Sequence, residues 1–446
     1  MRDEASKTLR LALPIIIGEL AQISLHIMDT AMVGAISYRH LAACALVMNV
    51  MNIPFVFGIG MTISVSQMVS MAHGRRDGQL VSHYFFNGFC ICALTALVIS
   101  AGLLAGKSIL SHLGQDPQVV ALALPFLELM GLSLIPMLLF MTLKQFADGL
   151  QITRMAMYFS LLALPVNVFL NWLLIYGNWG FPRLELRGAG WATLITRSFI
   201  LLLLAMTILG SNRFKRYVAV RGKQWRLHPK TIRELLGIGI PSSLQIGMEA
   251  GAFIVAGILI GTISALEQAA HQIALGCASF TFMVSMGLAQ AGSIRVSNAY
   301  GSRNWQKITA VGKSTLLVAL LYGTVCAAAF ALLRHQLPGL FNKDTGVLQL
   351  AGSLLLFAAV FQVSDSTQAI GAGLLRGIKD VRTPTLLIAV AYWVIGLPAG
   401  YLLAFIFDMG ARGLWLGLIL GLTFASLFLI RRFLVLSKRN TLAGRP

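Results

Sequence analysis

The sequence predicts an all-α integral membrane protein with twelve transmembrane helices in two six-helix lobes. Hydrophobic residues make up 57% of the 446 positions, charged residues make up 11%, and the mean hydropathy is +0.78. Soluble domains carry roughly 25% charged residues, so this composition excludes an ordinary soluble enzyme. The apolar residues also occur in stretches of about 20 to 30, long enough to cross a ~30 Å hydrocarbon core as helices. Finally, the pattern of the first half recurs in the second.

Twelve such stretches follow one another along the chain. The predicted spans are 9–36, 42–72, 83–106, 119–146, 153–177, 188–210, 235–262, 268–300, 307–333, 347–375, 383–407 and 411–436. The first contains Glu19 and Asp29 and has no small-residue cleavage site, so we expect it to be retained and not removed as a signal peptide.

The basic residues predict the orientation. With an even number of spans both termini lie on one side, and most Lys and Arg residues fall on that side, including Lys144, Arg295, Arg376, Arg445 and the stretch 211–234. The positive-inside rule makes that side the cytoplasm and the location the cytoplasmic (inner) membrane. The net charge of +19 is then explained by topology and by anionic lipid headgroups, without a nucleic-acid partner.

The sequence lacks the usual signatures of catalysis. The five cysteines have no metal-ligand spacing, and there is no phosphate loop or nucleophile elbow. We therefore expect no enzymatic activity, no cofactor and no resident metal. Transport would have to be driven by an ion gradient.

The two halves repeat one pattern. An offset of 227 aligns identical residues without gaps, and an offset of 228 aligns the ends of the fourth and tenth spans. Examples are Pro14 with Pro241, Gly34 with Gly261, Gly60 with Gly287, Arg76 with Arg303, and Arg154 with Arg382. Six spans per copy give parallel halves, which we place at 1–210 and 235–446 with a cytoplasmic linker at 211–234. The alternative is a duplication with only a structural role.

Polar residues form a stripe on the first span. An ionisable residue at the centre of a membrane helix costs at least about 2.5 to 3.5 kcal/mol, so each one suggests a function. Glu19, Gln22, His26 and Asp29 are three, four and three residues apart and share one helical face. That face should not contact lipid.

Other spans carry further polar groups, so each half has a polar lining. They are Glu128 in the fourth span, Asn167 and Asn171 in the fifth, Ser242, Gln245 and Glu249 in the seventh, and Gln362, Asp365 and Ser366 in the tenth. We favour function for Asp29, Glu249 and Asp365. Hydrogen bonding between helices is the alternative, above all for Asn171, Gln362 and Ser242. Glu19, Glu128 and His26 stay open between the two.

Pro14 lies inside the first span, and Pro241 occupies the equivalent place in the seventh. A proline removes one backbone hydrogen bond and can kink a helix. Because Pro14 precedes Asp29 by about four turns, it is a candidate hinge. The alternative is a proline tolerated near the end of a membrane helix.

Four strings resemble the multidrug and toxic compound extrusion (MATE) family, in its NorM-like branch. They are MDTAMVG at 28–34, NVFLNWLLIYG at 167–177, HQIAL at 271–275 and DSTQAIGAGLLRGIKD at 365–380. They occur in order in the expected spans, and the resemblance covers essentially the whole chain.

This resemblance implies a V-shaped, monomeric antiporter that confers drug resistance. It would export amphipathic, often cationic drugs in exchange for H⁺ or Na⁺. The matching site residues are Asp29, Asn167, Asn171 and Thr193 in the N-lobe, and Glu249 and Asp365 in the C-lobe. Some relatives have an acid where this chain has Asn171, so a sodium site in the N-lobe would rely on Asp29 alone.

We slightly favour protons as the coupling ion. Burial among apolar and neutral amide groups disfavours an ionised Asp29, so this carboxyl group could take up and release H⁺. Sodium would instead use Glu249, Asp365 and nearby hydroxyls. A rival interpretation is a flippase for lipid-linked precursors, and a more distant one is a membrane scaffold or receptor. A flippase cavity should carry Arg or Lys, whereas Arg197 alone is expected clearly within a span.

Overall fold

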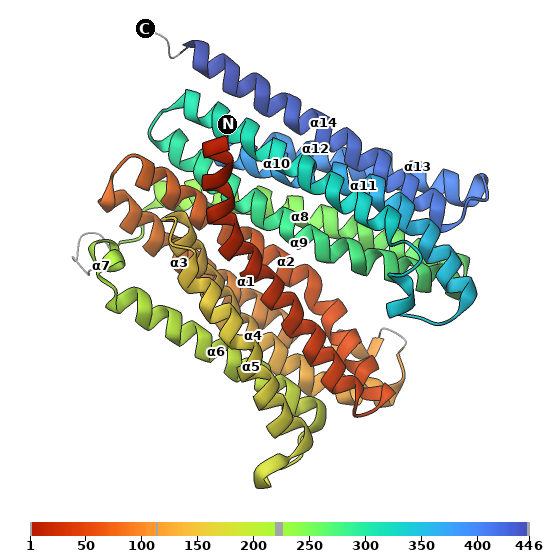
Figure 1. Ribbon diagram of the computed structural model, residues 1–446. Coiled ribbons are helices and arrows are strands. Elements are labelled where there is room, and N and C mark those ends of the chain that lie inside the picture. The colour runs from red at the N-terminus through yellow and green to blue at the C-terminus, as the bar shows by residue number, and fades with distance from the viewer. Residues whose placement is uncertain (1, 113–114, 219–225, 444–446) are drawn as a thin grey trace. The chain divides into compact units, whose positions relative to one another are not determined.

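The computed structural model describes residues 2–112, 115–218 and 226–443, and over these residues all the regular elements are helices (Figure 1). Within these described ranges, eleven single helices are long and apolar enough to span a membrane. They are α1 (Arg2–Gly34), α2 (Tyr38–Gly74), α3 (Gly78–Ala105), α4 (Pro117–Gly149), α5 (Arg154–Tyr176), α6 (Glu185–Gly210), α8 (Pro229–Ile263), α9 (Ala265–Gly301), α10 (Trp305–Leu332), α11 (Thr345–Gly377) and α14 (Ala411–Ala443).

The twelfth candidate span, Arg382–Ile406, is not a uniform α-helix. It consists of α12 (Arg382–Ala389), η4 (Val390–Gly396), α13 (Leu397–Tyr401) and η5 (Leu402–Ile406), and both η segments are π-helical. The prediction of an all-α protein with twelve spans is confirmed, but the π-helical turns were not predicted. The short elements are η1 (Lys107–His112), η2 (Asn178–Gly180), α7 (Asn212–Val218) and η3 (Pro338–Leu340).

The sequence repeat is also a structural repeat, visible in the helix caps. Ser37 and Ser264, 227 residues apart, cap α2 and α9 by accepting a backbone N–H three residues on. Asp77 caps α3, and the equivalent residue Asn304 caps α10. In the same way Asp116 caps α4 and Asp344 caps α11. Left-handed backbone recurs as well, at Arg76 and Arg303 and at Gln151 and Lys379. Equivalent turns therefore end equivalent helices.

The chain forms two compact units whose limits differ from the predicted lobes. One unit is Ile17–Ser243, and the other combines Met1–Ile16 with Leu244–Pro446. The start of α1 thus belongs with the second half of the chain, and the start of α8 with the first. The lobe boundaries at 1–210 and 235–446 stay a prediction. Residues 219–225 of the proposed linker, like Arg445, lie outside the described residues.

Two equivalent glycines explain how these helix starts are accommodated. A Cβ on Gly60 of α2 would overlap the backbone of Ser243 in α8. A Cβ on Gly287 of α9 would likewise overlap Ile16 of α1. Only glycine permits such close approach. The repeated glycines therefore let the beginning of α8 pack in the unit Ile17–Ser243 and the beginning of α1 pack in the other unit.

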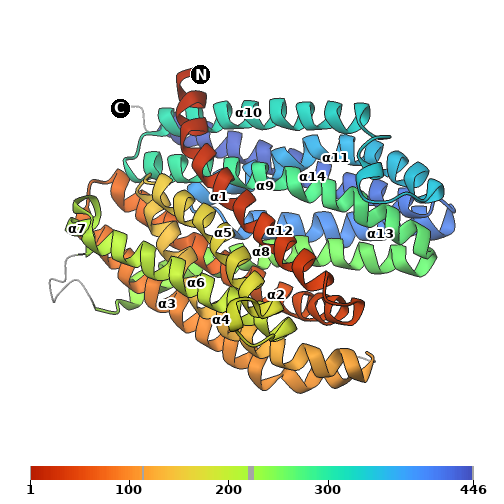
Figure 2. The same cartoon turned by 60° about the horizontal axis from the view of Figure 1, so that its bottom comes forward.

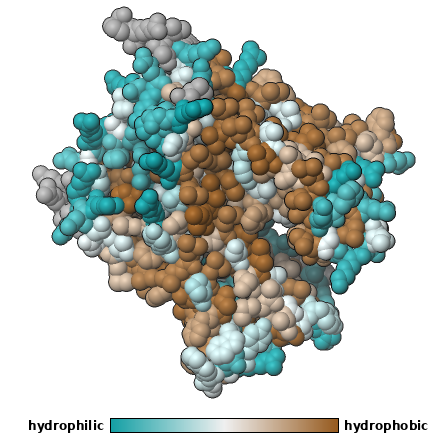
Figure 3. All heavy atoms as spheres, in the orientation of Figure 1, coloured by the Kyte–Doolittle hydropathy of each residue, from teal (hydrophilic) through white to brown (hydrophobic). Residues whose placement is uncertain are grey.

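In the unit Ile17–Ser243, α4 packs against α2, α3 and α6, and α5 packs against α6. In the other unit, α11 takes the equivalent place and packs against α9, α10 and α14 (Figures 1 and 2). Apolar side chains, brown in Figure 3, are exposed along the helices, as expected of surfaces that face lipid.

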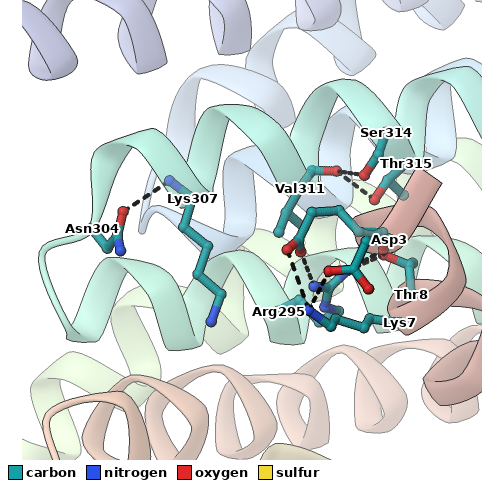
Figure 4. A network of polar contacts seen from close by, with 10 residues as sticks. Asp3, Lys7, Thr8, Arg295, Asn304, Lys307, Val311, Ser314 and Thr315 are labelled. Atoms are coloured by element: carbon teal, nitrogen blue, oxygen red, sulfur yellow. Dashed lines mark hydrogen bonds and ion pairs between the residues drawn. The ribbon is translucent and has the colours of Figure 1, made fainter. Parts of the chain in front are cut away.

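Arg295 of α9 holds the beginning of α1 (Figure 4). Its guanidinium group donates to the Glu4 carbonyl oxygen at 2.6 Å and to Thr8 Oγ1 at 2.5 Å, and it forms an ion pair with the Glu4 carboxylate. Lys7 and Asp3 pair beside it at 2.6 Å. The buried Arg295 therefore joins α9 to the beginning of α1.

Candidate functional site

The structure brings together the four residues predicted for the N-lobe site, which we call the Asp29 cluster: Asp29, Asn167, Asn171 and Thr193. Asn171 Nδ2 donates to Asp29 Oδ1 at 2.6 Å and to Asn167 Oδ1 at 3.0 Å. Thr193 Oγ1 donates to Asp29 Oδ2 at 3.4 Å. The two asparagines are four residues apart on α5, which places them on one face towards α1. All four side chains are buried.

The Asp29 cluster keeps unused hydrogen-bonding groups. Asn167 Nδ2 and Asn171 Oδ1 are buried and have no hydrogen-bond partner among the described residues. Arg197 of α6, also buried, lies within electrostatic range of Asp29 and donates to Ser133 Oγ at 2.7 Å. A buried polar group without a partner is costly, so such groups often mark sites for water, ions or ligands.

The other residues of the predicted stripe have different partners. Gln22 Nε2 lies 3.8 Å from Met141 Sδ of α4. His26 is partly exposed and within electrostatic range of Arg197. Glu19 pairs with Lys144 of α4 at 2.6 Å. The stripe does face other helices, but only Asp29 joins the asparagines.

Lys144 and Asp148 are buried charges that the sequence reasoning did not single out, and with Glu19, whose side chain is 24% exposed, they form what we call the Lys144 cluster. Lys144 is 2% exposed and Asp148 is fully buried. The two lie four residues apart on α4, and both Asp148 oxygens lack a hydrogen-bond partner within the described ranges. The predicted span ends at 146, short of Asp148, and the sequence prediction counts Lys144 only as a charge on the cytoplasmic side. The sequence signal for this cluster is a basic and an acidic residue four positions apart, Lys144 and Asp148, at the end of an apolar stretch.

Glu128 does not belong to a buried site. It pairs with Lys107 at 2.6 Å, and the two side chains are 44% and 49% exposed. Glu128 thus lies at the surface of the structure, and a function for it stays a prediction. Exposed pairs of this kind usually contribute about 0–1 kcal/mol.

The C-lobe residues Glu249 and Asp365 lie within electrostatic range of each other. Asp365 and Gln362 are buried on α11, and Asp365 Oδ2 and both Gln362 amide atoms have no hydrogen-bond partner in the described part of the chain. Gln245, one turn before Glu249 on α8, is buried as well. We call Glu249, Asp365 and Gln362 the Glu249 cluster.

Tyr392 adds an unpredicted hydroxyl to the Glu249 cluster. Its Oη donates to Glu249 Oε1 at 3.5 Å, and the side chain is fully buried in the π-helical turn η4. Such turns are frequent at functional sites because they redirect single side chains. Arg376 of α11 is also buried and within electrostatic range of Glu249.

Pro14 is buried within α1, which runs without a break from Arg2 to Gly34. The border between the two compact units falls two residues later, after Ile16. The equivalent border in α8 falls after Ser243, two residues beyond Pro241. No group of three or more His, Cys, Asp or Glu side chains that could hold a metal occurs among the residues described.

The family model described as MatE matches residues 14–173 and 241–402, one block in each half. The chain belongs to the MatE family. This confirms the resemblance seen in the sequence and makes the protein a multi-pass membrane transporter and not an enzyme. The two matched blocks begin at Pro14 and Pro241, the repeat-equivalent prolines.

Curated relatives align over nearly their full length. A "Probable multidrug resistance protein NorM" from Rhizobium meliloti is 37% identical over 98% of this chain and 94% of its own. A "Multidrug resistance protein NorM" from Photobacterium profundum is 30% identical over 97% of this chain and 95% of its own.

Solved structures share the fold. A eukaryotic MATE transporter superposes with a TM-score of 0.89 at 21% identity, over 98% of both chains. A MATE described as in the bent conformation gives 0.91 at 20% identity, over 99% of this chain and 97% of its own. At these identities the similarity concerns the fold alone.

Proposed function

We propose that this protein is a secondary active multidrug efflux antiporter that exports amphipathic, often cationic compounds in exchange for an inward cation. The relatives named NorM are multidrug resistance proteins, and they align end to end with this chain. The single observation that carries the proposal is the Asp29 cluster, in which one buried carboxylate is held by neutral partners that keep unused polar atoms. A cationic drug and a small cation can compete for that charge.

We favour H⁺ as the exchanged cation, with Na⁺ as the alternative. Asn167, Asn171 and Thr193 supply two amide oxygens and one hydroxyl besides the carboxylate, but the Asn167 oxygen already accepts from Asn171, and no second acid lies in the cluster as described. Sodium prefers several oxygen ligands, whereas a proton needs only a carboxylate oxygen. The Glu249 cluster, with two acids and the Tyr392 hydroxyl, is the more suitable place for Na⁺.

Pro14 is proposed as the hinge of the transport cycle. Its ring removes one hydrogen bond at the point where α1 passes from one compact unit to the other. Two solved MATE structures are described as bent and straight conformations. A bend at Pro14 would displace Asp29, four turns further along α1.

The proposal includes the cellular setting. The protein would lie in the inner membrane as a monomer with both termini in the cytoplasm, with membrane lipids and small-molecule drugs as its partners. The excess of Lys and Arg over Asp and Glu, 35 against 16, supports this orientation because most of the basic residues fall on one predicted side.

Transport by proteoliposomes tests the function directly. Purified protein is reconstituted, and movement of the fluorescent cation ethidium is followed under an imposed pH gradient or an imposed sodium gradient, each alone. We expect the pH gradient to drive transport, Asp29→Asn to abolish it, and Glu128→Gln, which changes an exposed acid, to leave it intact. Two results would contradict the antiport proposal. One is net ethidium transport when no gradient is imposed, and the other is the absence of transport under both the pH gradient and the sodium gradient.

A further inference from the structure

The short helix α7, between α6 and α8, has one buried and one basic face. Phe214, Tyr217 and Val218 are buried, and the last two follow Phe214 by three and four residues. Arg213 and Arg216 are exposed and three residues apart, so they share a face, and this face adjoins Tyr217, which lies four residues after Arg213. The helix is amphipathic, with its arginines at the edge of the packed side.

Contacts within the unit Ile17–Ser243 fix α7 in place. The Phe214 ring packs 5.8 Å from the ring of Phe146 in α4, measured between centroids. Ser82 Oγ of α3 donates to the Tyr217 carbonyl oxygen at 2.7 Å. Because both ends of the buried face are anchored, Arg213 and Arg216 project from a rigid support and lose less freedom when they bind a ligand.

Two adjoining cavities lie beside the basic face of α7. Their volumes are about 420 and 340 Å³, and both are lined by His73, Arg216 and Tyr217. Arg76, from the turn between α2 and α3, lines the first cavity, and Arg213 lines the second. Three helix ends thus bring three arginines and a histidine to one hollow, and Figure 3 shows hydrophilic residues gathered on this side of the unit.

The charges in this hollow are unbalanced. Its one carboxylate, Asp77, already accepts the Leu80 N–H at 2.9 Å as the N-cap of α3. His73 Nδ1 is buried and has no hydrogen-bond partner among the described residues. The Arg216 guanidinium lies over the Tyr217 ring, 4.5 Å from its centroid, and its Nη2 donates to the Tyr217 hydroxyl, which orients the remaining N–H groups.

We propose that His73, Arg76, Arg213, Arg216 and Tyr217 form a binding site for a phosphate group, which we call the α7 pocket. Arginine donates two parallel hydrogen bonds to phosphate oxygens, and arginines from separate elements can hold such a group from several sides. The group would belong to an anionic phospholipid headgroup or to a free phosphorylated solute. The pocket lies at the ends of α2 and α3, the level at which headgroups meet a membrane protein. This site does not depend on the proposed efflux activity.

The repeat supplies a matched control. Arg303 occupies the turn equivalent to that of Arg76, with φ of 56° and 58° respectively, but it has no counterpart of α7 in the repeat pattern. Asparagine tolerates this left-handed backbone better than most residues, so Arg76→Asn and Arg303→Asn remove the charge at equal backbone cost. On α7 itself, Lys215 is exposed but lines neither cavity, so Lys215→Gln controls for Arg216→Gln.

The test is a calorimetric titration of the full-length protein in nanodiscs of zwitterionic lipid. The probes are inorganic phosphate, and dihexanoyl phosphatidylglycerol and dihexanoyl phosphatidylcholine below their micelle concentrations. We expect saturable binding of phosphate or phosphatidylglycerol, weakened at least tenfold by Arg216→Gln and Arg76→Asn and less than twofold by Lys215→Gln and Arg303→Asn. Phosphatidylglycerol binding without phosphate binding identifies a lipid site, and phosphate binding identifies a solute site.

Two results would overturn the proposal. One is the absence of saturable binding of either anion to the wild-type protein. The other is an equal loss of affinity in the pocket variants and their controls, which would indicate diffuse attraction to a basic surface. Thermal unfolding of all four variants checks that each keeps the fold, and the two Gln variants are at exposed positions of α7.

Discussion

At the scale of single residues, buried charge distinguishes the two halves of the chain. The Asp29 cluster contains one carboxylate with neutral partners, whereas the Glu249 cluster contains two acids and a tyrosine hydroxyl. Asp29, Glu249 and Asp365 could be predicted because a charge within an apolar stretch is visible in the sequence. Tyr392 could not, since its hydroxyl reaches Glu249 only through the packing of distant helices.

The Lys144 cluster makes a prediction about stability. Lys144→Met removes the cation beside the fully buried Asp148 and the partly exposed Glu19, and a buried charge left without its partner costs about 3–5 kcal/mol. We expect a clear fall in the thermal unfolding midpoint of the purified protein.

The exposed pair formed by Lys107 and Glu128 is the matched control for this change. Lys107→Met should cost about 0–1 kcal/mol, because solvent screens the remaining carboxylate. Adding Glu19→Gln to Lys144→Met should restore part of the lost stability. An equal loss in Lys144→Met and Lys107→Met would mean that the buried pair does not support the fold.

At the scale of elements, hydropathy located all twelve spans but placed many of their ends too early or too late. The helices continue beyond the apolar stretches, as α4 does to Gly149, because polar residues at helix ends still complete backbone hydrogen bonds. The π-helical turns η4 and η5 could not be predicted from hydropathy, because their residues are as apolar as those of the neighbouring α-helical turns. Glycines in this region show how tightly the segment packs: a Cβ on Gly417 of α14 would overlap Gly400 of α13.

That contact predicts the effect of one methyl group. Gly417→Ala places a carbon against the Gly400 backbone, which cannot rotate away, and overpacking of this kind costs about 1–3 kcal/mol. Gly276→Ala in α9 has no atom within 4 Å of the new methyl and should be neutral or slightly stabilising. Urea unfolding in detergent compares the two. Similar stability of both variants would contradict the close approach of α13 and α14.

At the scale of the whole molecule, the sequence repeat predicted the recurring helix pattern but not the packing partners of the helix beginnings. It predicted two copies of one helix pattern, and the shared caps and turns confirm that the local structure repeats. It did not reveal that the beginnings of α1 and α8 each pack with the other half of the chain, because sequence identity carries no information on partners. Each border between the units falls two residues after a repeated proline, Pro14 in α1 and Pro241 in α8.

The hinge proposal belongs to this scale. Pro14→Ala restores a backbone hydrogen bond at the border within α1, so the helix should bend less readily and ethidium export should slow severalfold. Folding should be kept, since alanine favours helix. Paired spin labels on α1 and α5 report the distance change between acidic and alkaline pH. A variant with wild-type export and the wild-type distance change would leave Pro14 without a role in the cycle.

The central claim is that drug and proton compete for the buried carboxylate of Asp29. The most direct measurement is proton release by purified protein in weakly buffered detergent when tetraphenylphosphonium, a permanent cation, is added. We expect the wild-type protein and Glu128→Gln to release protons as the cation binds, and Asp29→Asn to bind more weakly and to release none. Binding without proton release in the wild-type protein, or undiminished release in Asp29→Asn, would contradict the account.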